Sequence, residues 1–148
     1  MNDKLTKRMS RNIYIGGSAF SILLLIGLTI DTVRQVPKKE HREHLTHKVV
    51  KGKEVWEKNN CIGCHTLLGE GAYYAPELGN VFIRRGASNK EAFKAYLSAW
   101  MSSQPLEIEG RRKMPQFNLT DIEVDNMAEF LIWTSKIDTH EWPPNIEG

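Results

Sequence analysis

The chain has 148 residues, a formal net charge of +2 and 26% charged residues. This length suits about one domain. Acidic and basic residues are mixed along the chain rather than gathered in blocks, so there is no basic patch of the kind that binds nucleic acid. The short glycine cluster Gly69-Glu70-Gly71 has neither the lysine nor the spacing of a phosphate-binding loop. The sequence therefore gives no indication of nucleotide chemistry.

An uncharged, apolar stretch near the start of the chain predicts a membrane anchor. No charged side chain occurs from Ile13 to Ile30. Such a stretch approaches the length that crosses a bilayer as a helix, and only a helix satisfies its own backbone polar groups inside lipid. We expect a tail over residues 1–12 and a transmembrane helix over residues 13–33. A cleaved signal peptide is the alternative, but the segment from Asp31 to Gln35 offers no small-x-small cleavage site.

Residues 34–46 are predicted to form a charged, proline-containing linker. His41, His44 and His47 follow one another at intervals of three, which on a helix would place them along one face. A metal site there lacks a carboxylate or cysteine to complete it, so solvated histidines are the favoured interpretation.

The motif Cys61-Ile62-Gly63-Cys64-His65 uses both cysteines of the chain and has the C-x-x-C-H spacing of a c-type haem attachment site. One helical turn can present both thiols to the vinyl groups of the porphyrin, and a neutral histidine is a good axial ligand of iron. The alternatives are a thioredoxin-like redox pair, half of a zinc site and a structural disulfide. The redox pair lacks a βαβ context, and zinc lacks a second pair of cysteines. The motif predicts covalent haem c on Cys61 and Cys64, with His65 on the iron.

The predicted haem also orients the anchor. Four Lys or Arg residues precede the apolar stretch and four follow it closely, so the positive-inside rule is nearly balanced. Covalent haem attachment is associated with the outer side of the bacterial membrane. We therefore expect residues 1–12 to be cytoplasmic and the haem domain to lie on the periplasmic side.

Residues 47–138 are predicted to fold as an all-α domain of three or four helices with no convincing strands. Apolar positions predict a first helix over residues 47–59. Two capping boxes, Ser88 to Glu91 and Thr120 to Glu123, predict the starts of two later helices. Residues 139–148, which include Pro143-Pro144, should be extended.

The candidate core and the loop after the motif follow from the same patterns. One carbonyl of the loop over residues 69–79, which contains Pro76, is expected to accept the second ring N–H of His65. The last helix should bury a face that holds Val124, Met127, Leu131 and Thr134. The aromatic residues expected in the core or around the haem are Trp56, Phe93, Tyr96, Trp100, Phe130 and Trp133.

A low-spin electron carrier needs a sixth ligand on its iron, and a methionine opposite histidine raises the reduction potential. Met114 lies in a loop between two predicted helices, and Pro115 after it biases its backbone toward an extended form. Met101 and Met127 lie on predicted helix faces and suit packing. His140 is a further candidate. Met114 is the predicted second axial ligand.

The stretch from Asn59 to Val81 resembles the cytochrome c subunits of bacterial nitric oxide reductases. So do Met114-Pro115-Gln116-Phe117, the ending Ser135-Lys136-Ile137-Asp138 with Trp142-Pro143-Pro144-Asn145, and the start Arg11-Asn12-Ile13-Tyr14. The resemblance covers almost the whole chain, and the long loop after the motif is its most specific part. It implies a class I cytochrome c domain behind a single N-terminal transmembrane helix in the bacterial inner membrane.

The resemblance also implies partners and a site. A large membrane subunit with haem b and non-haem iron would reduce NO to N2O, and this chain would pass electrons to its haem b from a soluble periplasmic cytochrome c or cupredoxin. The chain would have no catalytic residues of its own. A calcium ion at the subunit interface would take ligands from the Gly71 carbonyl and the Tyr73 side chain. The matching haem residues are Cys61, Cys64, His65 and Met114.

Three other functions are open at this point. A membrane-tethered cytochrome c could serve an oxygen reductase or act as a free electron shuttle. A haem-based gas sensor would exchange a ligand at its iron, which firm binding of Met114 should prevent. A zinc or thiol redox protein would carry no covalent haem.

Overall fold

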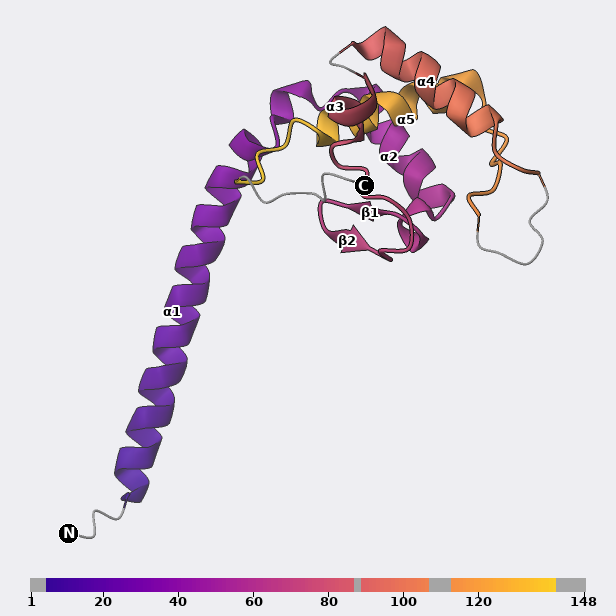
Figure 1. The fold of residues 1–148 in the computed structure, drawn as a ribbon. Helices are drawn as coiled ribbons and strands as arrows, with labels where there is room; N and C mark the ends of the chain where they lie inside the picture. The colour runs from indigo at the N-terminus through magenta and orange to yellow at the C-terminus, as the bar shows by residue number, and fades with distance from the viewer. Residues whose placement is uncertain (1–4, 87–88, 107–112, 141–148) are drawn as a thin grey trace. The chain divides into compact units, whose positions relative to one another are not determined.

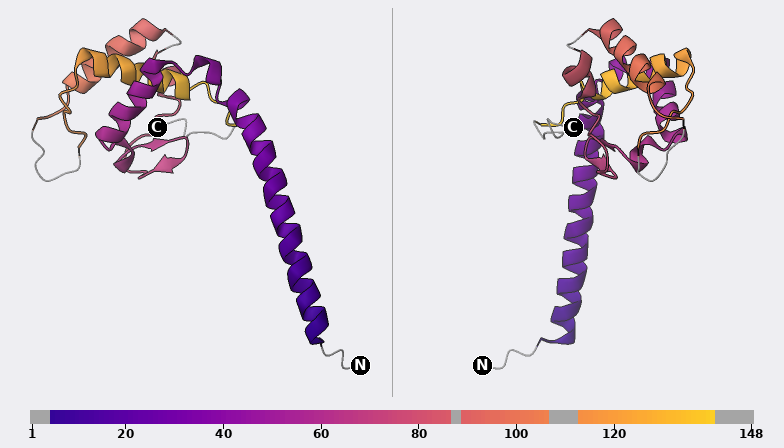
Figure 2. Two further views of the ribbon diagram at one scale, coloured as in Figure 1. Left: turned by 180° about the vertical axis from the view of Figure 1, so that it is seen from behind. Right: turned by 45° about the vertical axis from the view of Figure 1, so that its right-hand side comes forward.

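The computed structural model describes residues 5–86, 89–106 and 113–140. The chain divides into two compact units, Met1–Lys39 and Glu40–Gly148. The first unit contains one long helix, and the second contains the remaining helices together with a short hairpin (Figure 1 and Figure 2).

Helix α1 (Lys7–Lys39) has 33 residues and none of them is buried within the chain. Among the described residues it is the one helix that is long and apolar enough to cross a bilayer. It covers the predicted span over residues 13–33 and continues at both ends, passing Pro37 in the predicted linker. Lys38 and Lys39 lie in its last turn, where cations are favoured by the negative end of the helix dipole.

The segment after α1 forms a 3-10 turn, η1 (Arg42–His44). The rings of His41 and His44 lie 6.3 Å apart, and His41 Nδ1 is 3.3 Å from a carboxylate oxygen of Glu43. His47 is instead the first residue of the next helix. The three histidines therefore do not share one helical face, because the chain is not helical between His44 and His47.

The second unit is mainly helical, which confirms the all-α class. Its elements, in chain order, are α2 (His47–Lys58), the 3-10 turn η2 (Cys61–Gly63), β1 (Thr66–Leu67), β2 (Glu70–Gly71), α3 (Val81–Gly86), α4 (Lys90–Ser102) and α5 (Asp121–Thr134) (Figure 1).

The expectation of a domain without strands was wrong, because β1 and β2 form a short antiparallel hairpin. Thr66 pairs with Gly71, and Leu67 pairs with Glu70. The two residues between them, Leu68 and Gly69, have φ of 52° and 87°. A two-residue hairpin turn of type I′ needs positive φ at both central positions, and leucine at one of them hides that signal in the sequence.

Side-chain caps start the three longer helices of the second unit. Thr46 caps α2, and Thr120 with Glu123 forms the predicted capping box of α5. The first predicted capping box was displaced by one residue. Asn89 is the cap of α4, its Oδ1 accepting a hydrogen bond from Ala92 N at 3.0 Å, while Ser88 lies outside the described residues. Asparagine and serine are about equally good caps, so residue type alone could not choose between neighbours.

The core forms where α2 packs against α5. A Cβ added to Gly52 would lie 2.0 Å from the Asn126 carbonyl oxygen, so this glycine lets the two backbones approach closely. Trp56 and Phe130 pack beside it with ring centroids 6.2 Å apart. The four residues predicted for the inner face of α5 are all buried: Val124, Met127, Leu131 and Thr134. Trp100 differs from expectation, since it is 48% exposed on α4.

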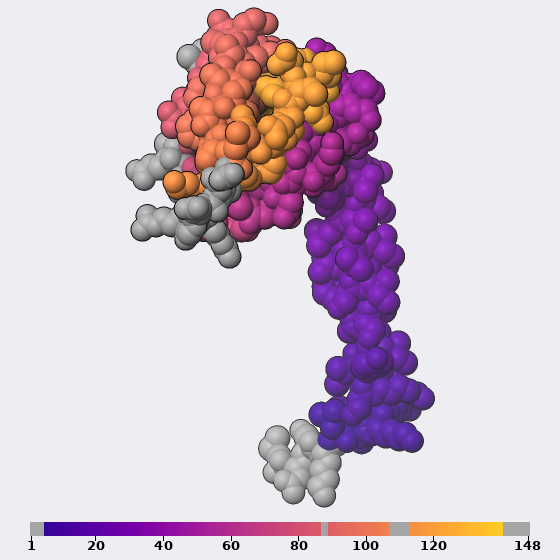
Figure 3. All heavy atoms as spheres, turned by 90° about the vertical axis from the view of Figure 1, so that its right-hand side faces the viewer, coloured from indigo at the N-terminus to yellow at the C-terminus, as the bar shows by residue number. Residues whose placement is uncertain are grey.

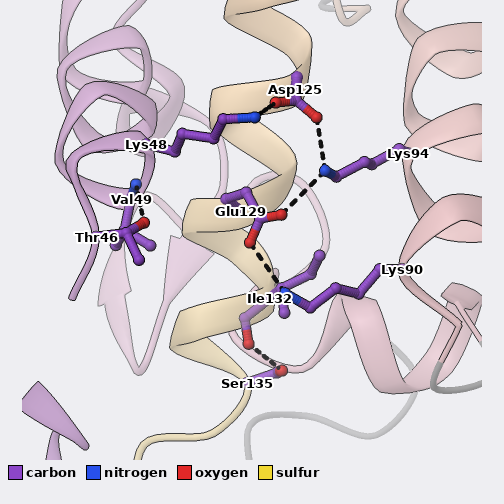
Figure 4. Close-up of polar contacts among 9 residues, drawn as sticks. All are labelled: Thr46, Lys48, Val49, Lys90, Lys94, Asp125, Glu129, Ile132 and Ser135. Atoms are coloured by element: carbon purple, nitrogen blue, oxygen red, sulfur yellow. Dashed lines mark hydrogen bonds and ion pairs between the residues drawn. The ribbon is translucent and has the colours of Figure 1, made fainter. Parts of the chain in front are cut away.

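Charged side chains link α5 to α2 and to α4 (Figure 4). Asp125 on α5 contacts Lys48 of α2 and Lys94 of α4, each at 2.6 Å. Glu129, one turn later, contacts Lys94 at 2.9 Å and Lys90 at 3.3 Å. Figure 3 shows α4 and α5 side by side, in orange and yellow. This ion-pair network therefore ties α2 and α4 to α5, the helix on which both of them pack.

The network also sets the charge states of its members. Hydrogen bonds from Lys48 and Lys94 lower the pKa of Asp125. Burial alone would raise the pKa of Glu129, but the bonds from Lys94 and Lys90 outweigh it and the net shift is downward. The pKa of Lys94 is raised, chiefly by its hydrogen bond to Asp125.

We predict that Lys94→Met lowers the free energy of unfolding by about 1 kcal/mol near pH 7, the scale of a partly exposed ion pair. Because the folded-state pKa values of Asp125 and Glu129 are lowered, their contribution is present above about pH 5 and is lost as the pH falls below about 4. Because the pKa of Lys94 is raised, its contribution holds up to about pH 10 and is lost above. Chemical denaturation of the full-length protein in detergent across this range measures the difference.

Lys51→Met is the matched control, since Lys51 forms an exposed pair with Glu54 within α2. It should change the free energy of unfolding by less than about 0.5 kcal/mol. If Lys94→Met lowered the free energy of unfolding by the same amount at acidic pH as near pH 7, the result would contradict an electrostatic origin.

Candidate functional site

Both cysteines lie on one tight turn that follows α2. Asn60 has φ of 50°, which reverses the chain after α2, and η2 then carries Cys61. Backbone N–H groups of Cys64 and His65 donate to the Cys61 carbonyl at 3.1 and 2.9 Å. The sequence predicts such a turn, because its spacing lets both thiols be presented together.

The two thiols are free and differ in environment. Cys61 is buried in the core, and this burial raises the pKa of its thiol to about 11. Cys64 is exposed. One sulfur is therefore anchored in the protein interior and the other lies at its surface.

His65 is oriented by the loop that follows the motif. Its Nδ1 lies 2.8 Å from the Pro76 carbonyl oxygen. A carbonyl can only accept, so Nδ1 carries the proton and Nε2 keeps a free lone pair for a metal ion. The expected loop carbonyl is thus that of Pro76, and its effect is to fix the tautomer in which the imidazole can bind iron.

Backbone hydrogen bonds fold this loop against the motif. Tyr74 N and Ala75 N both donate to the Cys64 carbonyl, at 3.1 and 2.8 Å, and Ala72 N donates to the Ile62 carbonyl at 3.2 Å. Gly71 has φ of 136°, and a Cβ there would lie 2.1 Å from the His65 carbonyl oxygen. Only glycine allows this approach, so the loop lies directly on the backbone of the haem motif.

Met114 is half-buried and lines the same cavity as the motif residues. The other candidate ligands do not line it. Met127 is 2% exposed in the core, Met101 packs against the core from α4, and His140 is exposed after α5. The residues around this cavity are Asn60, Cys61, Cys64, His65, Tyr74, Ala75, Lys113, Met114, Pro115 and Phe117.

The donor set of this cavity fits a c-type haem. It combines two thiols at C-x-x-C spacing, an imidazole with an available Nε2 and a thioether. Thiols at this spacing can bond to the two vinyl groups, while histidine and methionine are the axial pair of cytochromes c. Ala75, Pro115 and Phe117 add apolar walls suited to a porphyrin.

The two residues considered for calcium lie on the exposed side of the loop. Gly71 is exposed, and Tyr73 is 72% exposed with its hydroxyl donating to the Gly69 carbonyl at 2.6 Å. Within residues 5–86, 89–106 and 113–140, no group of three or more His, Cys, Asp or Glu side chains is placed to hold a metal ion.

Sequence reasoning missed one buried charge of this region. Glu77, next to Pro76, is only 5% exposed. Its carboxylate accepts hydrogen bonds from Leu68 N at 2.9 Å and from Gly79 N at 2.7 Å. Glutamate is usually exposed, so no pattern in the sequence indicates this position.

Comparison with known proteins agrees with this geometry. The cytochrome c family model matches residues 49–135. Three relatives are described as the C subunit of nitric oxide reductase. They come from Stutzerimonas stutzeri (62% identical over 148 residues), Paracoccus denitrificans (50% over 151) and Halomonas halodenitrificans (49% over 150), and each alignment covers 100% of both chains. The chain therefore belongs to the cytochrome c family and, within it, to the family of nitric oxide reductase C subunits.

Proposed function

We propose that this chain is the membrane-anchored electron-transfer subunit of a nitric oxide reductase. The observation that carries the proposal is that both thiols, His65 and Met114 line one cavity. The full-length likeness to nitric oxide reductase C subunits supports the choice of complex. The chain forms a complex with a catalytic subunit, and we propose that this partner holds haem b and the non-haem iron where NO is reduced to N2O.

The residues of the cavity have separate roles. Cys61 and Cys64 would hold one haem c covalently, and this group would supply one-electron exchange between ferric and ferrous iron. His65 would bind the iron through Nε2, while the Pro76 carbonyl accepts the hydrogen bond from its other ring nitrogen. Met114 would supply a thioether ligand to the same iron. With His65 and Met114 both bound to the iron, this subunit would relay electrons and leave NO chemistry to its partner.

The proposed arrangement in the membrane rests on the apolar helix α1 and on the haem motif, because covalent haem attachment is associated with the outer side of the bacterial membrane. The apolar part of this helix crosses the bacterial inner membrane once, with residues 1–12 in the cytoplasm and the cytochrome domain over residues 47–138 in the periplasm. Residues 34–46 and 139–148 flank the domain as linker and tail. Soluble periplasmic carriers, a cytochrome c or a cupredoxin, then reach the haem without crossing lipid.

A calcium ion at the junction with the catalytic subunit is a further part of the proposal. The Gly71 carbonyl and the Tyr73 side chain would supply two oxygen ligands from this chain, and the partner would supply the rest. Calcium takes 6–8 oxygen ligands, so two ligands from exposed loop residues suit a site shared between subunits.

Replacing Met114 by alanine tests the axial assignment. Haem attachment rests on the cysteines, so Met114→Ala should retain covalent haem on a denaturing gel. It should lose the methionine–iron charge-transfer band, and the reduction potential should fall because methionine ligation raises it. Optical spectroscopy and a redox titration of the purified protein measure both.

Met101→Ala is the control, since Met101 packs against the core from α4 and does not line the cavity. It should keep the band. Persistence of the band in Met114→Ala, or its loss in Met101→Ala, would refute the assignment of Met114.

Purification from membranes in mild detergent tests the function itself. We expect a stable partner that carries haem b and non-haem iron, and NO consumption by the complex when a reduced periplasmic carrier is supplied. A chain that purifies alone, or with a copper-containing oxygen reductase, would exclude the proposal.

Calcium content separates the interface-site proposal from the rest. The complex should contain calcium by elemental analysis, and Tyr73→Phe, which removes only the hydroxyl, should reduce the amount retained after dialysis against a chelator. Tyr74→Phe, in the neighbouring position, should retain it. Equal calcium in the two variants would argue against Tyr73 as a ligand.

A further inference from the structure

The loop after the haem motif contains a buried carboxylate that the proposed electron transfer does not use. Glu77 is 5% exposed, and its Oε1 accepts hydrogen bonds from both Leu68 N (2.9 Å) and Gly79 N (2.7 Å). Its Oε2 faces Gly69 N at 3.5 Å. A buried carboxylate is costly unless charge-assisted hydrogen bonds of this kind stabilise it.

These bonds end on the strained part of the hairpin. Leu68 has φ of 52°, a left-handed conformation that is strained for a non-glycine residue and persists only where surrounding contacts hold it in place. The carboxylate of Glu77 supplies such a contact, because it binds the N–H group of Leu68 itself. One side chain thus connects the hairpin turn to the segment nine residues later.

The same segment holds His65. Pro76, directly before Glu77, accepts the hydrogen bond from His65 Nδ1 at 2.8 Å. The Arg84 guanidinium donates to the Glu77 carbonyl, and Leu78 N donates to the Thr66 carbonyl at 2.9 Å. The Pro76 carbonyl is therefore part of a segment fixed on both sides, and the Glu77 carboxylate is the side-chain contact at its centre.

The carboxylate of Glu77 occupies the space beside Gly79. A Cβ added at Gly79 would lie 2.6 Å from Glu77 Oε1 and 3.0 Å from Leu68 Cδ2. A side chain at position 79 would therefore displace the carboxylate from Leu68 N.

We propose that Glu77 is a positioning residue for the axial histidine: its carboxylate fixes the Pro76 carbonyl against His65 and thereby tunes the reduction potential of the haem. The inference rests on the proposed function through the role of His65 as an iron ligand. A hydrogen bond accepted from the distal ring nitrogen makes a metal-bound imidazole a stronger donor, which favours ferric iron. If the Pro76 carbonyl is held less firmly, this hydrogen bond weakens. The reduced state of the haem then becomes relatively more stable, and the reduction potential rises.

Two substitutions separate the effect of the length of the Glu77 side chain from the effect of its negative charge. Glu77→Asp keeps the negative charge but is one methylene too short to hold both N–H groups. Glu77→Gln keeps the reach and an oxygen acceptor but removes the charge. We expect Glu77→Asp to favour the reduced state by on the order of threefold to tenfold, the upper value being about 59 mV for a one-electron couple. Glu77→Gln should shift the reduction potential less than Glu77→Asp does.

The measurements are a redox titration and the low-spin ferric EPR signal, which responds to the axial imidazole, on the purified complex. Glu70→Gln is the control for charge, since Glu70 is an exposed carboxylate of the same hairpin. Gly79→Ala leaves Glu77 in place but crowds its carboxylate, so it should shift both readouts in the direction of Glu77→Asp. If the aspartate variant does not accumulate, Gly79→Ala tests the positioning role of Glu77 in its place.

Two results would overturn the inference. Glu77→Gln could shift the potential as much as or more than Glu77→Asp, which would make Glu77 a charge near the haem rather than a positioning residue. Alternatively, Glu77→Asp or Gly79→Ala could leave the potential and the EPR signal of the wild-type protein unchanged. Failure of the proposed function is seen separately, because the wild-type protein would then lack the spectrum of a histidine–methionine haem c.

Discussion

The hydrogen bond between His65 Nδ1 and the Pro76 carbonyl joins the haem motif to the loop that covers it. It determines which ring nitrogen is free, and so which nitrogen of the imidazole can bind iron. The loop must return to the motif within eleven residues to make this contact. The tight hairpin over Leu68 and Gly69, the glycine at position 71 and the buried Glu77 all serve this return.

The packing of α2 on α5 provides the frame for the site. α2 leads into the turn that carries Cys61, and the capped start of α5 follows the segment that carries Met114. Lys58, the last residue of α2, lies 3.6 Å from Glu123 in the first turn of α5, so these two ends are neighbours. The close approach at Gly52 fixes the pairing of the helices and, through it, brings both axial candidates to one cavity.

Much of this architecture could be predicted because it depends on local spacing. The C-x-x-C-H turn, the capping box at Thr120 and the apolar face of α5 each involve residues within a few positions of one another. Other features could not be predicted. The hairpin has leucine where glycine or asparagine would signal a turn, and Trp100 has the helical spacing of a core residue yet lies on the exposed side of α4. In both cases packing overrides the local preference.

By itself, the sequence determined the long apolar helix, the helical class of the domain and the residues that can attach a haem, because each of these depends on residues that are neighbours in the chain. Only the tertiary structure decided that Met114, among the candidate ligands, shares a cavity with His65. It also decided that Pro76 is the acceptor and that the side chain of Glu77, within the same loop, is buried. These contacts join segments far apart along the chain, and their geometry depends on how the helices pack rather than on any local pattern.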